Sequence, residues 1–257
     1  MPSEYVAVCN DDGILRVTLN RPDKLNPLSS EIVYALQEAV AEAASDAVRV
    51  VLLTGSGRAF SAGADLRSSV TGSDVGDVLA RTYNPLVAAM RALPKPIVAA
   101  VNGICAGAAC NVALACDIVL AARSAVFIEV FARIGLLPDA GGTYLLPRAI
   151  GTPRAVAASM LAADIPAERA LAWGMVWDVV DDATLAPAAD ALARRLAAGP
   201  TRAYAASKAA IYGADESAFR AALDTEARLQ RGLGQSADFA EGVAAFLEKR
   251  PAAFTGT

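Results

Sequence analysis

The residues that could perform acid–base chemistry in this chain are few, because its 257 residues include no histidine. Ser–His and Cys–His nucleophiles, proton transfer by imidazole and the common zinc sites are therefore excluded. The cysteines at positions 9, 105, 110 and 116 form no CxxC pair, and we interpret them as small buried hydrophobic residues. Proton transfer must come from carboxylates, lysine, tyrosine or cysteine, and we expect no metal site.

Two carboxylates lie near one another in the middle of the chain. Asp139 stands in the segment GLLPDAGGTYLLPR, between Pro138 and a Gly-Gly pair that opens a predicted helix. On the residues alone, a helix N-cap is the commoner role for an aspartate in this place. Glu129, in AVFIEVF, alternates with apolar residues along a predicted strand or edge. A side chain that faces solvent is the simplest expectation there, and we assign Glu129 no role in catalysis.

Two glycine-rich segments could present backbone amides to a ligand. GSGRAFSAGADL, residues 55–66, follows a predicted strand, and its glycines permit left-handed conformations and close approach. It does not complete the GxGxxG pattern of a dinucleotide-binding loop. NGICAGAACNVALACD, residues 102–117, leads into a helix predicted to begin near Ala108. The free amides of that helix could bind an anion, or its small residues could serve only close packing on a strand.

These segments are connected by alternating strands and helices. Continuous apolar runs predict strands buried on both faces, as in a parallel sheet, and helices are expected over 29–44, 78–93 and 108–115. This alternation predicts an α/β fold. The stretch 68–76 is predicted to be a mobile surface loop. The strand candidates are EYVAV, ILRVTLN, VRVVLLTG, IVAAVNG, DIVLAA and MVWDVV.

The character of the chain changes at about Thr184. Ala-rich segments with Leu, Arg and Glu then follow one another through Phe246 without a strand candidate. We therefore predict a catalytic core over 1–183 and a helical region over 184–257. The apolar stripe at 244–247 needs a surface to pack on, and a neighbouring subunit is the natural candidate.

Composition excludes several classes of protein. Hydrophobic residues make up 55% of the chain and charged residues 19%, which excludes a disordered protein. No apolar run reaches the roughly 18 residues of a membrane span. The net charge is −4 and the 23 Lys and Arg are scattered, so we expect no nucleic-acid partner. The first residues have neither signal-peptide nor transit-peptide character, and we expect a cytoplasmic protein.

Several segments, in this order and spacing, resemble the enoyl-CoA hydratase/isomerase (crotonase) family, and the resemblance extends over essentially the whole chain. It implies a spiral of repeated ββα units followed by a helical trimerisation region, assembled as a homotrimer or a dimer of trimers. Within the family the chain looks most like the ring-1,2-epoxyphenylacetyl-CoA isomerases of phenylacetate breakdown, given RTYNPLV, WGMVWDVVDD and RPAAFTG. The segments that carry the family resemblance are NRPDKLNPLS, GRAFSAGADL, NGICAGAACNVALACD, GLLPDAGGTYLLPR and EGVAAFLEKRPAAF.

The resemblance also implies roles for individual residues. The thioester carbonyl would bind between the backbone amides of Ala64 and Ala108, which form an oxyanion hole. The two glutamates of the family's hydratases match Asn111 and Phe131, so ordinary hydration is not expected. Asp139 matches the aspartate that isomerases of the family place beside the acyl chain, and this replaces the helix-cap interpretation.

For coenzyme A, the resemblance points to contacts along the chain and from a neighbouring subunit. A lone lysine is usually a solvated surface charge, and this is the simpler alternative for Lys24 and Lys249. No cofactor is implied beyond the coenzyme A of the substrate thioester. The residues concerned are Lys24 and Leu25, then Ala62, Asp65 and Leu66 through their backbone, and Phe246 and Lys249 from a neighbouring subunit.

The expected activity is therefore acyl-CoA isomerisation through a thioester enolate. Asp139 would remove the proton and return it elsewhere, converting ring-1,2-epoxyphenylacetyl-CoA to the oxepin product or shifting double bonds in enoyl-CoAs. Residues 67–83 are expected to form part of the acyl pocket. The alternatives are a hydratase or other crotonase-type reaction, and a non-catalytic CoA-binding subunit in which Asp139 is a helix cap.

Overall fold

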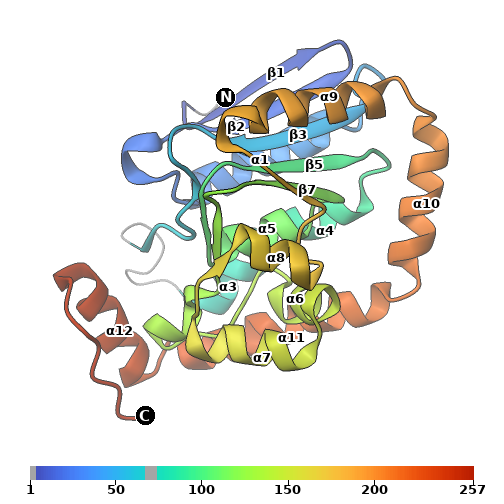
Figure 1. The fold of residues 1–257 in the computed structure, drawn as a ribbon. Helices are drawn as coiled ribbons and strands as arrows, with labels where there is room; N and C mark the ends of the chain where they lie inside the picture. The colour runs from blue at the N-terminus through green and yellow to red at the C-terminus, as the bar shows by residue number, and fades with distance from the viewer. Residues whose placement is uncertain (1–3, 67–73) are drawn as a thin grey trace.

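A computed structural model describes residues 4–66 and 74–257 of the chain. Its centre is a six-stranded sheet in the order β1-β2-β3-β5-β7-β10 (Figure 1). Each of the predicted strand runs contributes one strand to this sheet. The strands are β1 (Val6–Asp11), β2 (Ile14–Leu19), β3 (Val50–Gly55), β5 (Ile97–Val101), β7 (Ile118–Ala122) and β10 (Asp178–Val180).

The large sheet is parallel except at one edge. β2, β3, β5, β7 and β10 pair in parallel, whereas β1 pairs antiparallel with β2 through a hairpin. Every residue of β5 is buried, but only Val6 of β1 is buried. Our expectation of strands buried on both faces is therefore wrong for β1, because it is an edge strand with no helix packed over most of its length.

A second, smaller sheet has the order β4-β6-β8-β9. β4 follows β3, β6 follows β5 and β8 follows β7, and a helix comes after each of these strand pairs. The chain thus repeats a ββα unit, and the predicted fold class is confirmed. These short strands are β4 (Ala59–Ser61), β6 (Ile104–Ala106), β8 (Val126–Ile128) and β9 (Ile165–Pro166).

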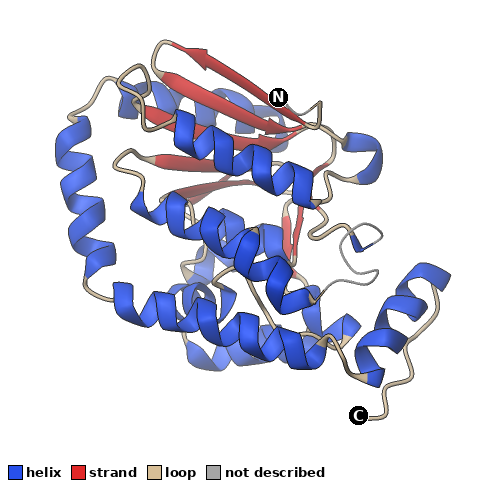
Figure 2. Ribbon diagram, turned by 180° about the vertical axis from the view of Figure 1, so that it is seen from behind, coloured by secondary structure: helices blue, strands red, loops and turns tan. Residues whose placement is uncertain are grey.

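Helices cover both faces of the large sheet. α9 (Leu185–Ala197) crosses one face (Figure 1), and α1 (Ser30–Glu42) and α4 (Tyr83–Ala92) lie over the other (Figure 2). α1 begins where predicted, because the hydroxyl of Ser29 accepts a hydrogen bond from the Ile32 amide at 3.4 Å.

The predicted helix over 78–93 is two helices, α3 (Val75–Arg81) and α4, which are separated at Thr82. Pro85 gives the reason. It has no N–H to donate to the carbonyl of Arg81, and its ring would clash with that carbonyl in a continuous helix. The predicted loop over 68–76 lies mostly outside the described residues, and its last residues begin α3.

From Asp182 to Glu248 the described chain is built of helices and the turns between them. α11 (Glu216–Leu233) packs on α3 and on α6 (Gly142–Ile150), and α12 (Ala237–Glu248) packs on the short helix η2 (Val130–Ile134) at one end of the molecule (Figure 1). The division at 184 and its role in oligomerisation stay predictions. The remaining helices are η1 (Pro22–Lys24), α5 (Ala108–Leu114), α7 (Thr152–Leu161), α8 (Ala167–Trp173), η3 (Asp182–Thr184) and α10 (Thr201–Gly213).

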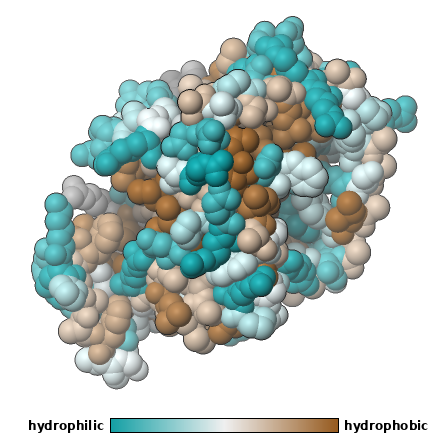
Figure 3. All heavy atoms as spheres, in the orientation of Figure 1, coloured by the Kyte–Doolittle hydropathy of each residue, from teal (hydrophilic) through white to brown (hydrophobic). Residues whose placement is uncertain are grey.

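Cys105, Cys110 and Cys116 are buried free thiols, as predicted, whereas Cys9 is exposed on β1. The interpretation of all four cysteines as buried residues is therefore wrong for Cys9, because it lies on the uncovered part of the edge strand. Across the described residues, the helices are too short or too polar to cross a membrane. Hydrophilic side chains are spread over the face seen in Figure 3, with apolar patches between them.

Candidate active site

Two adjoining cavities lie between the strand ends of the core and α12. The inner cavity has a volume of about 230 Å³ and the outer one about 760 Å³. The inner wall is mainly apolar, whereas Arg21, Lys24 and Asp65 line the outer cavity. This arrangement suits a ligand with a polar part outside and an apolar part inside. The residues shared by both walls are Ala62, Ala64, Leu66 and Phe246.

The backbone amide of Ala64 is available to a ligand. Leu28 donates to the Gly63 carbonyl at 2.7 Å and accepts from the Asp65 amide at 3.3 Å, in a parallel bridge. Since successive amides of an extended chain point to opposite sides, the amide of Ala64 points away from Leu28. Within the described chain it has no backbone acceptor, and Ala64 lines both cavities.

The amide of Ala108 is available for a different reason. Ala108 is the first residue of α5, as predicted, and the first amides of a helix have no acceptor within it. Gly107 precedes it with a φ of 55° and donates its own N–H to Ile128 at 2.8 Å. Ala108 also lines the inner cavity.

A close contact between two backbones brings these amides to the same place. Gly63 has a φ of +90°, and a Cβ atom there would lie 2.7 Å from the carbonyl oxygen of Ala106. Such a distance is a clash, so only glycine fits here. The contact fixes the segment that carries Ala64 against the start of α5, where Ala108 lies.

Asn26 organises the loops behind this contact. Its buried side chain donates to the carbonyls of Ser56 and Ala59, both at 2.9 Å, and accepts from the Arg21 amide at 2.8 Å. Sequence reasoning did not single out Asn26, although it lies within NRPDKLNPLS. Its backbone has a positive φ of 52°, a conformation that asparagine tolerates better than most residues.

Asp139 is the one carboxylate among the described residues that line the inner cavity. Its Oδ2 atom accepts a hydrogen bond from Gln230 at 3.1 Å, and its buried Oδ1 atom has no partner among the described residues. Burial raises the pKa of Asp139 well above its usual range, the charge of Glu226 adds to this, and the bond from Gln230 opposes it. A raised pKa makes the ionised carboxylate a stronger base than an ordinary surface aspartate.

Asp139 does not cap α6. The N-cap position belongs to Gly141, and the buried carboxylate of Glu226, from α11, accepts from the amides of Gly141 and Thr143, both at 2.9 Å. The helix-cap interpretation of Asp139 is therefore wrong, because a residue far away in sequence takes that role. Glu226 was missed, although a glutamate on the buried stripe of a helix, between Leu223 and Ala227, was a visible signal.

Glu129 is completely buried rather than exposed to solvent, so that expectation is wrong. It lies between β8 and η2, and Asn111 donates a hydrogen bond to its Oε2 atom at 3.4 Å. Burial raises the pKa of Glu129 to about 7, and hydrogen bonds involving Cys110 and Asn111 oppose that rise. Glu129 does not belong to the described wall of either cavity.

Comparison with known proteins decides the family. Residues 10–257 match the enoyl-CoA hydratase/isomerase family. The chain belongs to the enoyl-CoA hydratase/isomerase family. It is 46% identical to the 1,2-epoxyphenylacetyl-CoA isomerase of Escherichia coli K12, over 98% of this chain and 99% of the relative. It is 47% identical to a probable enoyl-CoA hydratase of Rhodobacter capsulatus, over 95% of each chain.

Solved structures agree with this membership. An enoyl-CoA hydratase of Mycobacterium avium subsp. paratuberculosis K-10 superposes with a TM-score of 0.92 at 38% identity, over 99% of this chain and 100% of that structure. The chain is also 37% identical to the trans-2-decenoyl-[acyl-carrier-protein] isomerase of Streptococcus mutans, over 96% of each. The expectation of a family enzyme of the isomerase type is confirmed.

Asn111 and Phe131, which the sequence resemblance matched to the two glutamates of the family's hydratases, lie in different surroundings. Phe131 lines the inner cavity. Asn111 is buried behind the wall and donates to the backbone carbonyl of Asp139 at 2.8 Å. Neither side chain carries a titrating group, and Asp139 is the carboxylate that lines the described wall of the inner cavity.

The structure brings most of the predicted coenzyme A residues together. Lys24 lines the outer cavity with Asp65, which pairs with Arg21 at 3.3 Å. Leu25 accepts from the Ala62 amide at 2.9 Å but lies outside the cavity walls.

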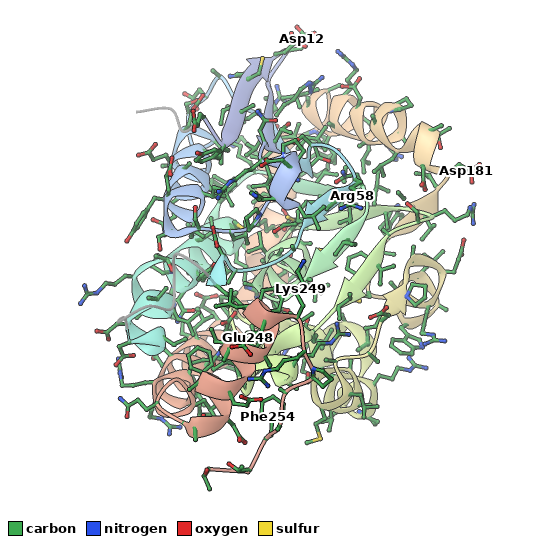
Figure 4. The ribbon with its side chains drawn as sticks, turned by 90° about the vertical axis from the view of Figure 1, so that its left-hand side faces the viewer. Asp12, Arg58, Asp181, Glu248, Lys249 and Phe254 are labelled. Atoms are coloured by element: carbon green, nitrogen blue, oxygen red, sulfur yellow. The ribbon has the colours of Figure 1, made fainter. Side chains whose placement is uncertain are left out.

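The two α12 residues predicted to come from a neighbouring subunit differ from each other. Phe246 lines both cavities of its own chain, so a partner is not needed to bring it there. Lys249 is exposed at the C-terminal end of α12, on the side of the molecule that also carries Arg58 (Figure 4). It belongs to neither cavity wall, and its coenzyme A contact stays a prediction.

The contact of Gly63 can be tested in this family enzyme with a matched pair of glycines. Gly63→Ala should lower kcat/KM for an acyl-CoA substrate by up to about 100-fold, because the clash displaces the Ala64 amide. Gly151 has a similar φ of +81° with nothing within 4 Å of an added Cβ. Gly151→Ala should therefore keep most activity. Equal losses in the two variants, corrected for folded protein, would contradict the role of this contact.

The buried carboxyl of Glu129 predicts a pH-dependent stability. Its pKa of about 7 in the folded chain exceeds its ordinary value of 4.5, so the folded state binds more protons between these pH values. Stability is therefore lost as the pH rises from about 4.5 to 7. Glu129→Gln should match wild type near pH 4.5 and exceed it at pH 8, by on the order of 3 kcal/mol.

Denaturant unfolding at several pH values measures this difference. The same exchange at the exposed Glu42 serves as the control and should leave the pH dependence of stability as in wild type. A stability difference between Glu129→Gln and wild type that is constant from pH 4.5 to 8 would show that Glu129 is not a buried titrating group.

Proposed function

We propose that this enzyme isomerises acyl-CoA thioesters with Asp139 as its one acid–base group, and that its substrate is ring-1,2-epoxyphenylacetyl-CoA. The observation that carries the proposal is that Asp139 lines a mainly apolar cavity, and that its buried Oδ1 atom has no hydrogen-bond partner among the described residues. Ala64 and Ala108, with their available amides, line the same cavity.

The chemistry follows from these groups. The carboxylate of Asp139 removes a proton from the carbon next to the thioester carbonyl, and the electron pair of that C–H bond forms an enolate. The amides of Ala64 and Ala108 stabilise the enolate oxygen. The enolate electrons form a double bond to the ring carbon that bears the side chain, and the carbon–carbon bond of the epoxide breaks while both carbon–oxygen bonds are kept, which gives the seven-membered oxepin ring. Asp139 then returns the proton to a ring carbon, where the electron pair of the broken bond is delocalised. Substrate and product have the same formula.

Isomerisation suits this site better than hydration does. Adding water requires one group to activate water and another to exchange the carbon-bound proton. The matching positions hold Asn111 and Phe131, whereas an isomerase can use one carboxylate twice. Hydration remains the second candidate because several similar relatives, including the one from R. capsulatus, are named enoyl-CoA hydratases.

The identity of the acyl group is supported by similarity and by the cavity. The relative that is 46% identical over nearly the full length of both chains is a 1,2-epoxyphenylacetyl-CoA isomerase. The inner cavity is walled by Val75, Val78, Leu79 and Tyr83 from the segment expected to form the acyl pocket. Its volume of about 230 Å³ accommodates a six-carbon ring.

The other parts of the proposal concern coenzyme A and assembly. Lys24 would contact the phosphates in the outer cavity, with backbone contacts from Ala62, Asp65 and Leu66, and no further cofactor takes part. A homotrimer or a dimer of trimers is proposed on the family resemblance, and the cytoplasmic location stays a prediction. The non-catalytic CoA-binding alternative loses its support, since it rested on Asp139 as a helix cap and Glu226 has that role.

Asp139→Asn tests the proposal. With epoxyphenylacetyl-CoA and, separately, a 3-enoyl-CoA, turnover by the variant should fall roughly 10²- to 10⁴-fold, the usual contribution of a general base. Mass spectrometry and absorbance follow the products. Glu129→Gln is the matched control, because it neutralises a buried carboxyl that lies outside the cavity walls, and it should keep most of the turnover.

Other outcomes separate the alternatives. No turnover of either substrate by the wild-type enzyme would remove the proposed reaction. Water addition to crotonyl-CoA would favour the hydratase. Full turnover by Asp139→Asn would require a different acid–base group.

A further inference from the structure

Two polar residues on α11 lie against the segment that carries Asp139. Glu226 and Gln230 are one helical turn apart, and both are completely buried. They continue the apolar stripe of Phe219 and Leu223, where buried polar side chains are costly unless they form hydrogen bonds. Neither residue belongs to the described wall of either cavity, so neither contacts the acyl group from that position.

The amide of Gln230 is fixed in orientation by the backbone of Leu137. Its Oε1 atom accepts from the Leu137 amide at 3.4 Å, and its Nε2 atom donates to the Leu137 carbonyl at 2.9 Å. The donor end therefore faces the loop before α6. From there Nε2 also donates to Oδ2 of Asp139 at 3.1 Å.

Because of this bond, the two carboxylate oxygens of Asp139 have different surroundings. Oδ2 is held by Gln230, whereas Oδ1 has no partner among the described residues. Asn111 holds the same residue from the other side, by donating to its backbone carbonyl at 2.8 Å. With the main chain and one carboxylate oxygen fixed, the second oxygen has a defined direction.

We propose that Gln230 is a positioning residue, which holds Oδ2 of Asp139 so that Oδ1 is presented to the substrate in the inner cavity. This inference rests on the proposed function of Asp139 as the proton shuttle. It makes α11 of the C-terminal helical region part of the catalytic apparatus.

The charged groups around Asp139 give the proposal a specific signature. Glu226 on α11 and Glu129 before η2 both disfavour the carboxylate of Asp139, and desolvation by burial is larger than either. Tyr83 on α4, whose own pKa burial raises, stays neutral, and Arg133 of η2 pairs with Asp164 at 3.3 Å. Gln230 is the group whose hydrogen bond favours the carboxylate. Removing it should therefore make Asp139 protonate at higher pH.

Gln230→Met tests this, because methionine preserves the length and apolar packing of the side chain but has no donor. With the proposed epoxide substrate, kcat at pH 7 should fall about tenfold, as expected for losing a hydrogen bond to a charged group. KM should change little. The acid limb of the kcat profile, where activity is lost as Asp139 is protonated, should move to higher pH.

Gln37→Met is the matched control. Like Gln230, Gln37 donates to a backbone carbonyl, that of Thr82, at 2.6 Å. Its side chain is half-buried, whereas that of Gln230 is fully buried. Its loss should lower thermal stability without moving the acid limb. Gln230→Glu is a second variant, which keeps the side-chain shape but puts a carboxylate beside Asp139, so its acid limb should move further than that of Gln230→Met.

A double variant separates positioning from a merely structural role. If Gln230 acts through Asp139, adding Gln230→Met to Asp139→Asn should cause no further loss of turnover. A wild-type acid limb in Gln230→Met, or a further full loss in the double variant, would overturn the role of Gln230 while Asp139→Asn stays inactive. Retained turnover in Asp139→Asn alone would instead overturn the proposed function, and with it this inference.

Discussion

The burial of one carboxylate is the constraint on which the site depends. A charged carboxylate in an apolar wall is costly, and proteins reduce that cost by hydrogen bonds or by a raised pKa. Asp139 has both, because Gln230 donates to one oxygen and burial raises the pKa of the group. The other oxygen is left without a partner among the described residues. The proposed role of Asp139 as the proton shuttle depends on this buried and partly unpaired carboxyl group.

The ββα repeat provides the other half of the site. The chain leaves β4 and β6 at the same side of the small sheet, and the contact of Gly63 with Ala106 brings the two following segments together. Two backbone amides then line the cavity on which Asp139 lies. Because the donors belong to the main chain, their geometry depends on glycine conformations and strand pairing rather than on side-chain identity.

The sequence predicted the parts of this structure that have a local signal. The long strands, the start of α5 at Ala108 and the helical C-terminal region follow from apolar runs, small residues and composition. The short strands of the small sheet were missed, since two or three residues show no periodicity. The break at Thr82 was not predicted, although Pro85 is a local signal for it. Glu226 and Gln230 could not be linked to Asp139, because some 90 residues separate them and only tertiary packing brings them together.

Transfer of a hydrogen label is the most direct test of the central claim. The claim is that one carboxylate moves the proton from one carbon to another. Substrate deuterated next to the thioester carbonyl is turned over in ordinary water, and the product is analysed by mass spectrometry at low conversion. If the buried Asp139 returns the same hydrogen that it removed, a substantial part of the deuterium should be retained in the product, at a different carbon. Complete loss of deuterium to solvent, at a rate that matches turnover, would contradict a single shielded shuttle and indicate exchange with water.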